Sequence, residues 1–461
     1  MGLFRKTAKA DLVVYNCTIY SSVGEKPFFG AVACRDGKIT AIGDMDSLAP
    51  LMDSETRSVD LSGRYVIPGL IKLSDSPVMK SFCGRYMDLT HCEGMESLSD
   101  MLTFWNASHP DDEIVFGYGY DESIFEGRSD ENDDEEYSRQ KTAETIAVLD
   151  SIFPDRPAVL LCGSTVSCIM NTAASNIVNE TAEEEMVQYI TAPYILNLLI
   201  PFDFEPIYEE ACLRIQEDLS AGFTSVINLG SPDYFEALYQ DALISLYNDD
   251  SLDQRFFGSY MMNRPLLPKG LVRKLMERKT ICNEIDGMIG AEMLNIRLDN
   301  SSAPISFSMH ALEQILTEAA DKGFKIYISA AGSGDVELAL NGLEHIRSKG
   351  FKNPFTIESV HDPAMFSEQF IYSQTCIYID PAVLRGECTT EEYLSALTLT
   401  ASEAAGLDNC AGSIEKGKYA DMLVYSTDPM DMSPGQLMES GPDMVIINGK
   451  IVSSSMMEVV K

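Results

Sequence analysis

Three segments of the chain read as a helix, a glycine, a phenylalanine and then a β-rich run. Gly222, Gly323 and Gly350 each end a helical pattern in this way. A helix often ends at a residue in the left-handed region, which glycine adopts without strain. Repeated helix-to-strand units predict a parallel sheet covered by helices, either a closed (β/α)8 barrel or an open doubly wound sheet. The pattern itself does not choose between these two folds.

The two ends of the chain carry strands with hairpin signals. Asp36-Gly37 near the start and Asn448-Gly449 near the end lie between apolar flanks, which is typical of tight two-residue turns. Isolated hairpins are only marginally stable, so both ends are expected to share one domain. The predicted domains are a composite β-sandwich from 1–66 and 407–461, and an inserted barrel domain, 67–406, elaborated by an acidic insert at 78–200.

A late helix is marked at both of its ends. Thr389 and Glu392 have the spacing of a capping box, the following residues have helical periodicity, and Gly406 is placed to terminate the helix. The region before Thr389 is short. This short spacing limits the number of strands that a barrel can contain.

The charge of the chain excludes one class of partner. Its 461 residues include 34 Lys and Arg against 71 Asp and Glu, which gives a formal net charge of -37. Such a surface repels a phosphate backbone, so nucleic acid is not an expected partner.

The cysteine pattern and hydropathy indicate a cytoplasmic protein. The eleven Cys residues form no CxxC pair and no framework of close spacings, which argues against disulfides and zinc ribbons. The N-terminus lacks an apolar signal core, and no run approaches the roughly 18 apolar residues of a membrane span. We expect neither secretion nor a membrane, and the sequence allows a homo-oligomer.

Several motifs resemble one enzyme superfamily. RYVIPGLI after the first strands, and GSIEKGKYADMLVY with VIINGKIV near the end, resemble the framing motifs of metal-dependent amidohydrolases. GYGYDESIFEGR, PDRPAVLL and a helix start at Asn171 to Ala174 resemble the formamide-deformylase-like branch, amidohydrolase family 3.

The resemblance implies a (β/α)8 TIM-like barrel beside a β-sandwich formed by both termini. It also implies one or two divalent metal ions, usually zinc, at the carboxyl ends of the barrel strands, where they activate water to hydrolyse C–N bonds. The implied ligands are a His-x-His, a carboxylated Lys, two further His and a late Asp.

The implied ligand positions carry other residues in this chain. The segment after RYVIPGLI reads KLSDS, with Ser in place of both His; LNIRLDNS has Asn in place of Lys; FKIYISAAG and FTIESV have Ser in place of His. We therefore predict a polar pocket at one mouth of the barrel and no metal centre. Its residues are Ser74, Ser76, Asn295, Ser329 and Ser359.

The late Asp is not found, because the chain passes from YSQTCIYIDP to Thr389 within a few residues. The barrel therefore has either lost its eighth strand or closes with another element. Three further residues remain candidates for the site: Asp121 in GYGYDESIFEGR, Asp299 in LNIRLDNS, and His361 beyond FTIESV.

Other chemistries have weaker signals. Lys72 and Ser74 lie two residues apart, which permits a Ser-Lys nucleophilic pair if the amine is desolvated. Cys162, Cys168 and Cys376 are candidate nucleophiles, although a buried Cys is usually a small core residue. His310 and His345, in helical stretches, are expected on solvated helix faces.

The sequence therefore predicts an amidohydrolase-superfamily protein that has lost its metal centre. In this interpretation it is a pseudoenzyme with no cofactor, and it has a structural role or binds a small polar ligand. The alternative is an active hydrolase of N-acyl or N-formyl amides with an atypical centre.

Overall fold

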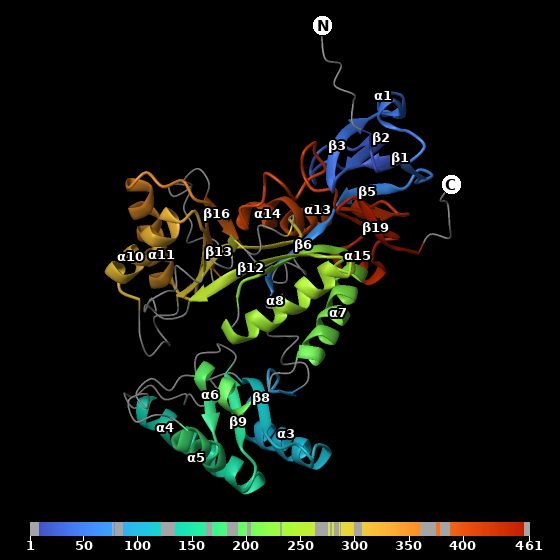
Figure 1. The fold of residues 1–461 in the computed structure, drawn as a ribbon. Helices are drawn as coiled ribbons and strands as arrows, with labels where there is room; N and C mark the ends of the chain where they lie inside the picture. Colours follow the sequence, from blue (N-terminus) through green and yellow to red (C-terminus); the bar gives the residue numbers. More distant parts are fainter. Residues whose placement is uncertain are drawn as a thin grey trace. The chain divides into compact units, whose positions relative to one another are not determined.

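The computed structural model of the chain (Figure 1) forms two compact units. One unit contains residues 1–76, 212–230 and 243–461, and the other contains 77–211 and 231–242. No helix in the described part is both long and apolar enough to cross a bilayer. The structure describes residues 9–75, 78, 86–120, 134–162, 168–181, 192–200, 204–230, 233–262, 275–276, 279–280, 285, 287–298, 307–359, 375–378 and 388–455.

Strands from both ends of the chain form one eight-stranded sheet in the first unit. The order is β19-β18-β17-β5-β1-β2-β3, and β4 pairs with β1. The bounds are β1 Leu12–Ile19, β2 Phe28–Arg35, β3 Lys38–Gly43, β4 Arg57–Asp60, β5 Tyr65–Pro68, β17 Met422–Tyr425, β18 Met444–Ile447 and β19 Lys450–Ser454. Because this sheet belongs to the same compact unit as the parallel sheet below, a separate sandwich domain remains a prediction.

Both hairpin turns predicted from the sequence are confirmed. Asp36 and Gly37 have φ angles of 50° and 73°, and Asn448 and Gly449 have 54° and 70°, as a two-residue turn with two left-handed positions requires. The turns also touch: a Cβ on Gly37 would lie 1.9 Å from Oδ1 of Asn448.

The second sheet of this unit is parallel and curled, and its described part has seven strands. The order β16-β15-β14-β13-β12-β11-β6 follows the chain, as in a TIM barrel. Gly222, Gly323 and Gly350 have φ angles of 90°, 78° and 85°, so the predicted helix ends are confirmed. The bounds are β6 Leu70–Asp75, β11 Phe223–Asn228, β12 Arg255–Met262, β13 Ile289–Leu298, β14 Lys325–Ala330, β15 Phe355–Ser359 and β16 Thr375–Tyr378.

The two faces of the parallel sheet have different neighbours. On the outer face, Leu294, Ile296 and Ile328 pack with residues of α10 (Met309–Asp321) and α11 (Ser333–Ser348). On the inner face, Met293 and Tyr327 pack with alanines of α14 (Ala401–Ala404). Helix α14 contacts both β6 and β16, the edge strands of the described sheet. The same helix, α14, therefore lies against both edge strands of the described sheet.

The late helix begins as predicted but is not regular. Thr389 and Glu392 form the capping box at the start of α13 (Thr390–Ser395), and Gly406 follows the end of α14 with a φ of 63°. Between α13 and α14 the chain makes a π-helical turn, η6 (Ala396–Thr400). In this turn the Thr398 hydroxyl donates to the Leu394 carbonyl at 2.7 Å.

The second unit contains a four-stranded sheet with the order β10-β9-β8-β7. Its core packs Leu98 and Leu102 of α3 and Leu149 of α4 against this sheet. The bounds are β7 Met87–Asp88, α3 Met95–Ser108, β8 Val115–Tyr120, α4 Asp134–Ile152, β9 Ala158–Cys162, β10 Cys168–Met170, α5 Thr172–Thr181 and α6 Ala192–Leu199.

The helix start predicted after PDRPAVLL is also confirmed, because Asn171 caps α5 by accepting from the Ala174 amide at 2.9 Å. The remaining helices are α1 Met45–Leu48, η1 Ala49–Leu51, α7 Phe204–Ser220, α8 Asp233–Asn248, η7 Pro429–Asp431 and α15 Pro434–Ser440.

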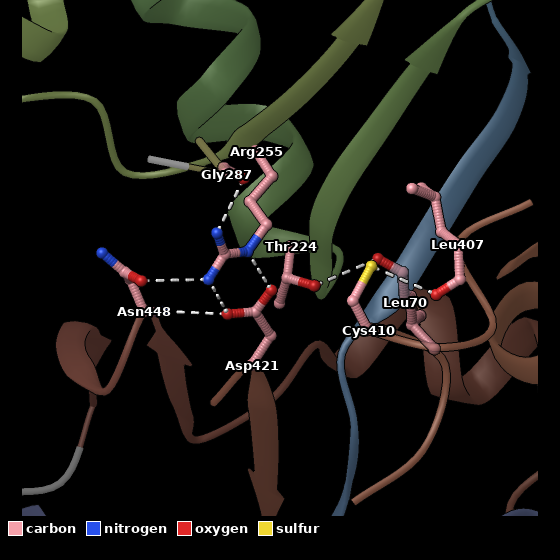
Figure 2. A network of polar contacts seen from close by, with 8 residues as sticks. All are labelled: Leu70, Thr224, Arg255, Gly287, Leu407, Cys410, Asp421 and Asn448. Carbon is pink, nitrogen blue, oxygen red and sulfur yellow. Dashed lines mark hydrogen bonds and ion pairs between the residues drawn. The ribbon is translucent and has the colours of Figure 1, made fainter. Parts of the chain in front are cut away.

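A buried ion pair joins the two sheets of the first unit (Figure 2). Arg255, at the start of β12, has a side chain that is 0% exposed, and its Nε and Nη2 donate to the Asp421 carboxylate at 2.6 and 3.1 Å. The same guanidinium donates to the Gly287 carbonyl at 2.8 Å and to Oδ1 of Asn448 at 3.1 Å. Its carbon lies 3.7 Å from the centre of the Tyr419 ring. We call these five residues the sheet-joining network.

Candidate functional site

The strand register places a row of polar residues on the inner face, towards the carboxyl ends of the strands. Arg297 of β13 pairs with Ser329 of β14, which pairs with Glu358 of β15. Side chains of paired residues lie on the same face of a sheet, and two residues earlier on β13 and β14 are the inner-face Asn295 and Tyr327. We call Arg297, Ser329 and Glu358 the inner-face row.

The inner-face row contains a guanidinium, a carboxylate and a hydroxyl group. The Ser329 hydroxyl donates to Oε2 of Glu358 at 2.9 Å. Burial lowers the pKa of the Arg297 guanidinium, and the negative charge of Glu358 acts in the opposite direction. Carboxyl ends of parallel strands are where barrels of this type position their chemistry. The row is therefore suited to holding a polar molecule.

On the inner face, two buried polar atoms have no hydrogen-bond partner among the residues that the structure describes. Asn295 is 0% exposed; its Nδ2 donates to the Leu229 carbonyl at 2.6 Å, while its Oδ1 is unsatisfied. Ser259 of β12 is 4% exposed and its Oγ is also unsatisfied. Ser259 pairs with the inner-face Met293, so its side chain lies on the inner face as well. An unsatisfied buried polar group costs about 1–3 kcal/mol, which a bound molecule would offset.

The structure describes the side chains of only two of the five predicted pocket residues. These are Asn295 and Ser329, which lie on neighbouring strands of the inner face. Ser74 and Ser359 belong to strands β6 and β15, but their side chains, like all of Ser76, lie outside the described part of the chain. A register irregularity between Lys72 and Asp75 also prevents simple alternation from assigning the faces there. The predicted convergence of all five stays a prediction.

The additional candidates Asp121, Asp299 and His361 lie outside the described residues. Two other interpretations are changed by the structure. Lys72 forms an ion pair with Asp218 at 2.7 Å, which favours its charged form and argues against a Ser-Lys nucleophile. Of the two histidines expected on solvated helix faces, His310 is exposed, whereas His345 is only 19% exposed and its Nδ1 lies 3.2 Å from a Glu313 oxygen on α10.

Two of the three cysteine candidates have described side chains, and both lie in buried surroundings. Burial raises the pKa of Cys168 to about 12, whereas a nucleophilic thiol needs a lowered value. Cys162 is a buried core residue, and the side chain of Cys376 lies outside the described part.

Sequence reasoning missed three residues of the site. Arg297 lies two positions after Asn295, so strand alternation was a signal that would have placed both on one face. Glu358 precedes Ser359 in FTIESV, but only the pairing of β14 with β15 brings it to Ser329. Ser259 had no signal, because its role depends on the pairing of β12 with β13.

Comparisons with known proteins find likenesses to parts of the chain. A model of the amidohydrolase family matches residues 382–453. The exoenzymes regulatory protein AepA of Pectobacterium carotovorum is 28% identical over 123 residues, 26% of each chain. Protein LONG AFTER FAR-RED 3 of Arabidopsis thaliana is 40% identical over 62 residues, 13% of this chain and 11% of that protein. The matches thus span about a quarter and a tenth of these two relatives.

Solved structures extend the likeness to the whole fold. An uncharacterized metal-dependent hydrolase from Pyrococcus horikoshii has a TM-score of 0.60 and 16% identity, covering 92% of this chain and 99% of that one. A zinc-bound adenosine deaminase from Xanthomonas campestris has a TM-score of 0.52 and 13% identity, covering 97% and 94%. At these identities the likeness to the two solved structures is a likeness of fold.

The described residues of the inner face do not fit a catalytic zinc or iron ion. Such an ion needs about three imidazole, thiolate or carboxylate ligands. In the described part, the inner face offers neutral hydroxyl and amide groups at Ser259, Asn295 and Ser329, and one carboxylate at Glu358 that already accepts a hydrogen bond. The positive guanidinium of Arg297 lies in the same row. This donor set suits a polar organic molecule better than a divalent cation.

Proposed function

We propose that this chain is a formamide-deformylase-like amidohydrolase that has lost its metal centre and binds a small polar molecule on the inner face of its parallel sheet. The observation that carries the proposal is the pair of buried, unsatisfied atoms, Oγ of Ser259 and Oδ1 of Asn295. In this proposal both atoms gain partners when the ligand binds. The proposal keeps the composite sandwich of 1–66 and 407–461 as a scaffold beside the site.

The chemical groups of the site determine which small molecules are suitable for testing binding. A guanidinium such as that of Arg297 binds a carboxylate through paired hydrogen bonds. The Ser259 hydroxyl and the Asn295 amide oxygen can bond the two sides of an amide group. N-formylglycine and N-acetylglycine carry both groups, and they also report whether any hydrolysis of N-acyl bonds occurs. Glycinamide, which lacks the carboxylate, is the matched negative probe.

Ser259→Ala is expected to weaken ligand binding without lowering the stability of the protein. Removing an unsatisfied buried hydroxyl should leave the free energy of unfolding unchanged or raise it by about 1 kcal/mol. The same change should weaken binding of the N-acyl amino acids about tenfold, because the bound state loses a buried hydrogen bond. Urea unfolding and isothermal titration calorimetry measure the two effects.

Ser402→Ala is the matched control. Ser402 is also buried, but its hydroxyl donates to the Leu399 carbonyl at 2.7 Å. Its replacement should lower stability by about 1 kcal/mol and leave binding unchanged. The proposal is contradicted if Ser259→Ala destabilises as much as Ser402→Ala and binds every probe as the parent does. Chelator-sensitive cleavage of either N-acyl probe would instead favour the active hydrolase.

A further inference from the structure

A cavity of about 330 Å³ lies at the opposite ends of the same strands. It is lined by residues near the starts of β12, β13 and β14 and by the loop that follows α14. Lys325, at the start of β14, lies four residues before Ser329, so the cavity and the inner-face row are about 13 Å apart along the strand. The volume is at the lower end of the range for small-molecule pockets. It suits a molecule of roughly ten non-hydrogen atoms.

The charges at the cavity wall do not cancel. Nζ of Lys325 lies 3.7 Å from one Glu292 oxygen, and Nζ of Lys279 lies 3.6 Å from the other. Among the described residues, Lys325 and Lys279, of which only Lys325 lines the cavity, thus share one carboxylate, which leaves one positive charge there in a chain whose net charge is -37. The nearby Arg255 is neutralised by Asp421. Asp408 adjoins the cavity, but its side chain is exposed and does not line it.

The ammonium group of Lys325 is well placed to donate a hydrogen bond to a further, anionic group. Its side chain is 17% exposed, and its distance to Glu292 exceeds the length of a good hydrogen bond. An ammonium has three donors, so the ion pair does not satisfy it. Burial lowers the pKa of this group, and the attraction of Glu292 opposes that effect.

The rest of the lining has a mixed character suited to an organic molecule. Phe257, Ile289, Met293 and Leu407 supply an apolar wall. Tyr419 and Cys410 supply polar groups; the Cys410 thiol donates to the Leu407 carbonyl at 3.3 Å (Figure 2). We propose that this cavity is a second ligand site, which binds a small carboxylic acid with an apolar body through its carboxylate on Lys325. The inference does not rest on the proposed function of the inner face.

Benzoate, phenylacetate and hexanoate are the probes, and benzamide is the neutral analogue of the first. At least one of the three acids should bind saturably in isothermal titration calorimetry, and its binding should weaken about tenfold or more in Lys325→Met. The exposed Lys352 provides the control, because Lys352→Met should bind as the parent does. Arg297→Met should also leave this binding unchanged, which separates the cavity from the inner-face site. Benzamide should bind at least about tenfold more weakly than benzoate.

A second measurement needs no variant. N-ethylmaleimide modification of Cys410, followed by peptide mass spectrometry, should slow when the best acid saturates the cavity, while the modification of Cys388, which does not line the cavity, stays constant. The proposal is overturned if none of the acids binds below about 10 mM. It is equally overturned if the acid that binds is unaffected by Lys325→Met or fails to protect Cys410.

Discussion

Replacing Asp421 with alanine is expected to lower the free energy of unfolding by about 3–5 kcal/mol. The reason is that Arg255, with a side chain 0% exposed, would keep its charge and lose its two bonds to the carboxylate. The backbone N–H of Asn448, which donates to Oδ1 of Asp421 at 2.9 Å, would lose its acceptor too. Urea unfolding monitored by circular dichroism measures the loss.

The control is an exposed ion pair of the same kind. Arg35 and Asp36 have side chains that are 36% and 81% exposed, so Arg35→Met should change stability by less than about 1 kcal/mol. Combining Arg255→Met with Asp421→Leu should recover much of the loss, because neither buried charge then remains. Equal, small effects of Asp421→Ala and Arg35→Met would show that the sheet-joining network does not stabilise the fold.

Gly69→Ala is expected to destabilise the protein by at least about 2 kcal/mol. A Cβ at this position would lie 2.1 Å from Oγ1 of Thr224 and 2.8 Å from its Cβ. Thr224 is 1% exposed on β11 and has little room to move. The midpoint of urea unfolding should therefore fall, with little change in its slope.

Two further variants test the reason for this effect. Thr224→Ala removes the two nearest atoms, so it should recover part of the stability lost in Gly69→Ala. A Cβ on Gly435 in α15 would have no atom within 4 Å, and Gly435→Ala should be neutral or slightly stabilising. The steric account fails if Gly69→Ala is as well tolerated as Gly435→Ala.

Both framing motifs thus have a structural explanation. Gly69 belongs to RYVIPGLI, where it allows β6 to approach β11, and Asp421 belongs to GSIEKGKYADMLVY, where it fixes the start of β12. Neither role depends on a metal ion. A chain can therefore keep these motifs and the fold while its strand ends carry other residues.

The features that the sequence predicted well are local. Asp36-Gly37, Asn448-Gly449 and the glycines at helix ends are set by the backbone angles of one or two residues. The capping box of Thr389 and Glu392 spans a single turn. Such signals need no knowledge of distant contacts, and the structure confirms them.

The site depends on contacts that local patterns do not contain. Arg255 and Asp421 are 166 residues apart, and nothing near either residue in the sequence identifies its partner. The register of β14 and β15 determines that Glu358 meets Ser329, and a shift by one residue would exchange the faces. For this reason Glu358 and Ser259 were found only in the structure.

The metal content of the purified protein tests the central claim most directly. After expression in medium supplemented with zinc, iron and manganese, and gel filtration, we expect less than about one tenth of an ion per chain. Ser74→His combined with Ser76→His should also show no hydrolysis of N-formyl or N-acyl amides, because two imidazoles fall short of the three protein ligands of catalytic zinc. About one ion per chain, retained through gel filtration and accompanied by chelator-sensitive cleavage of those amides by the unmodified protein, would contradict the account.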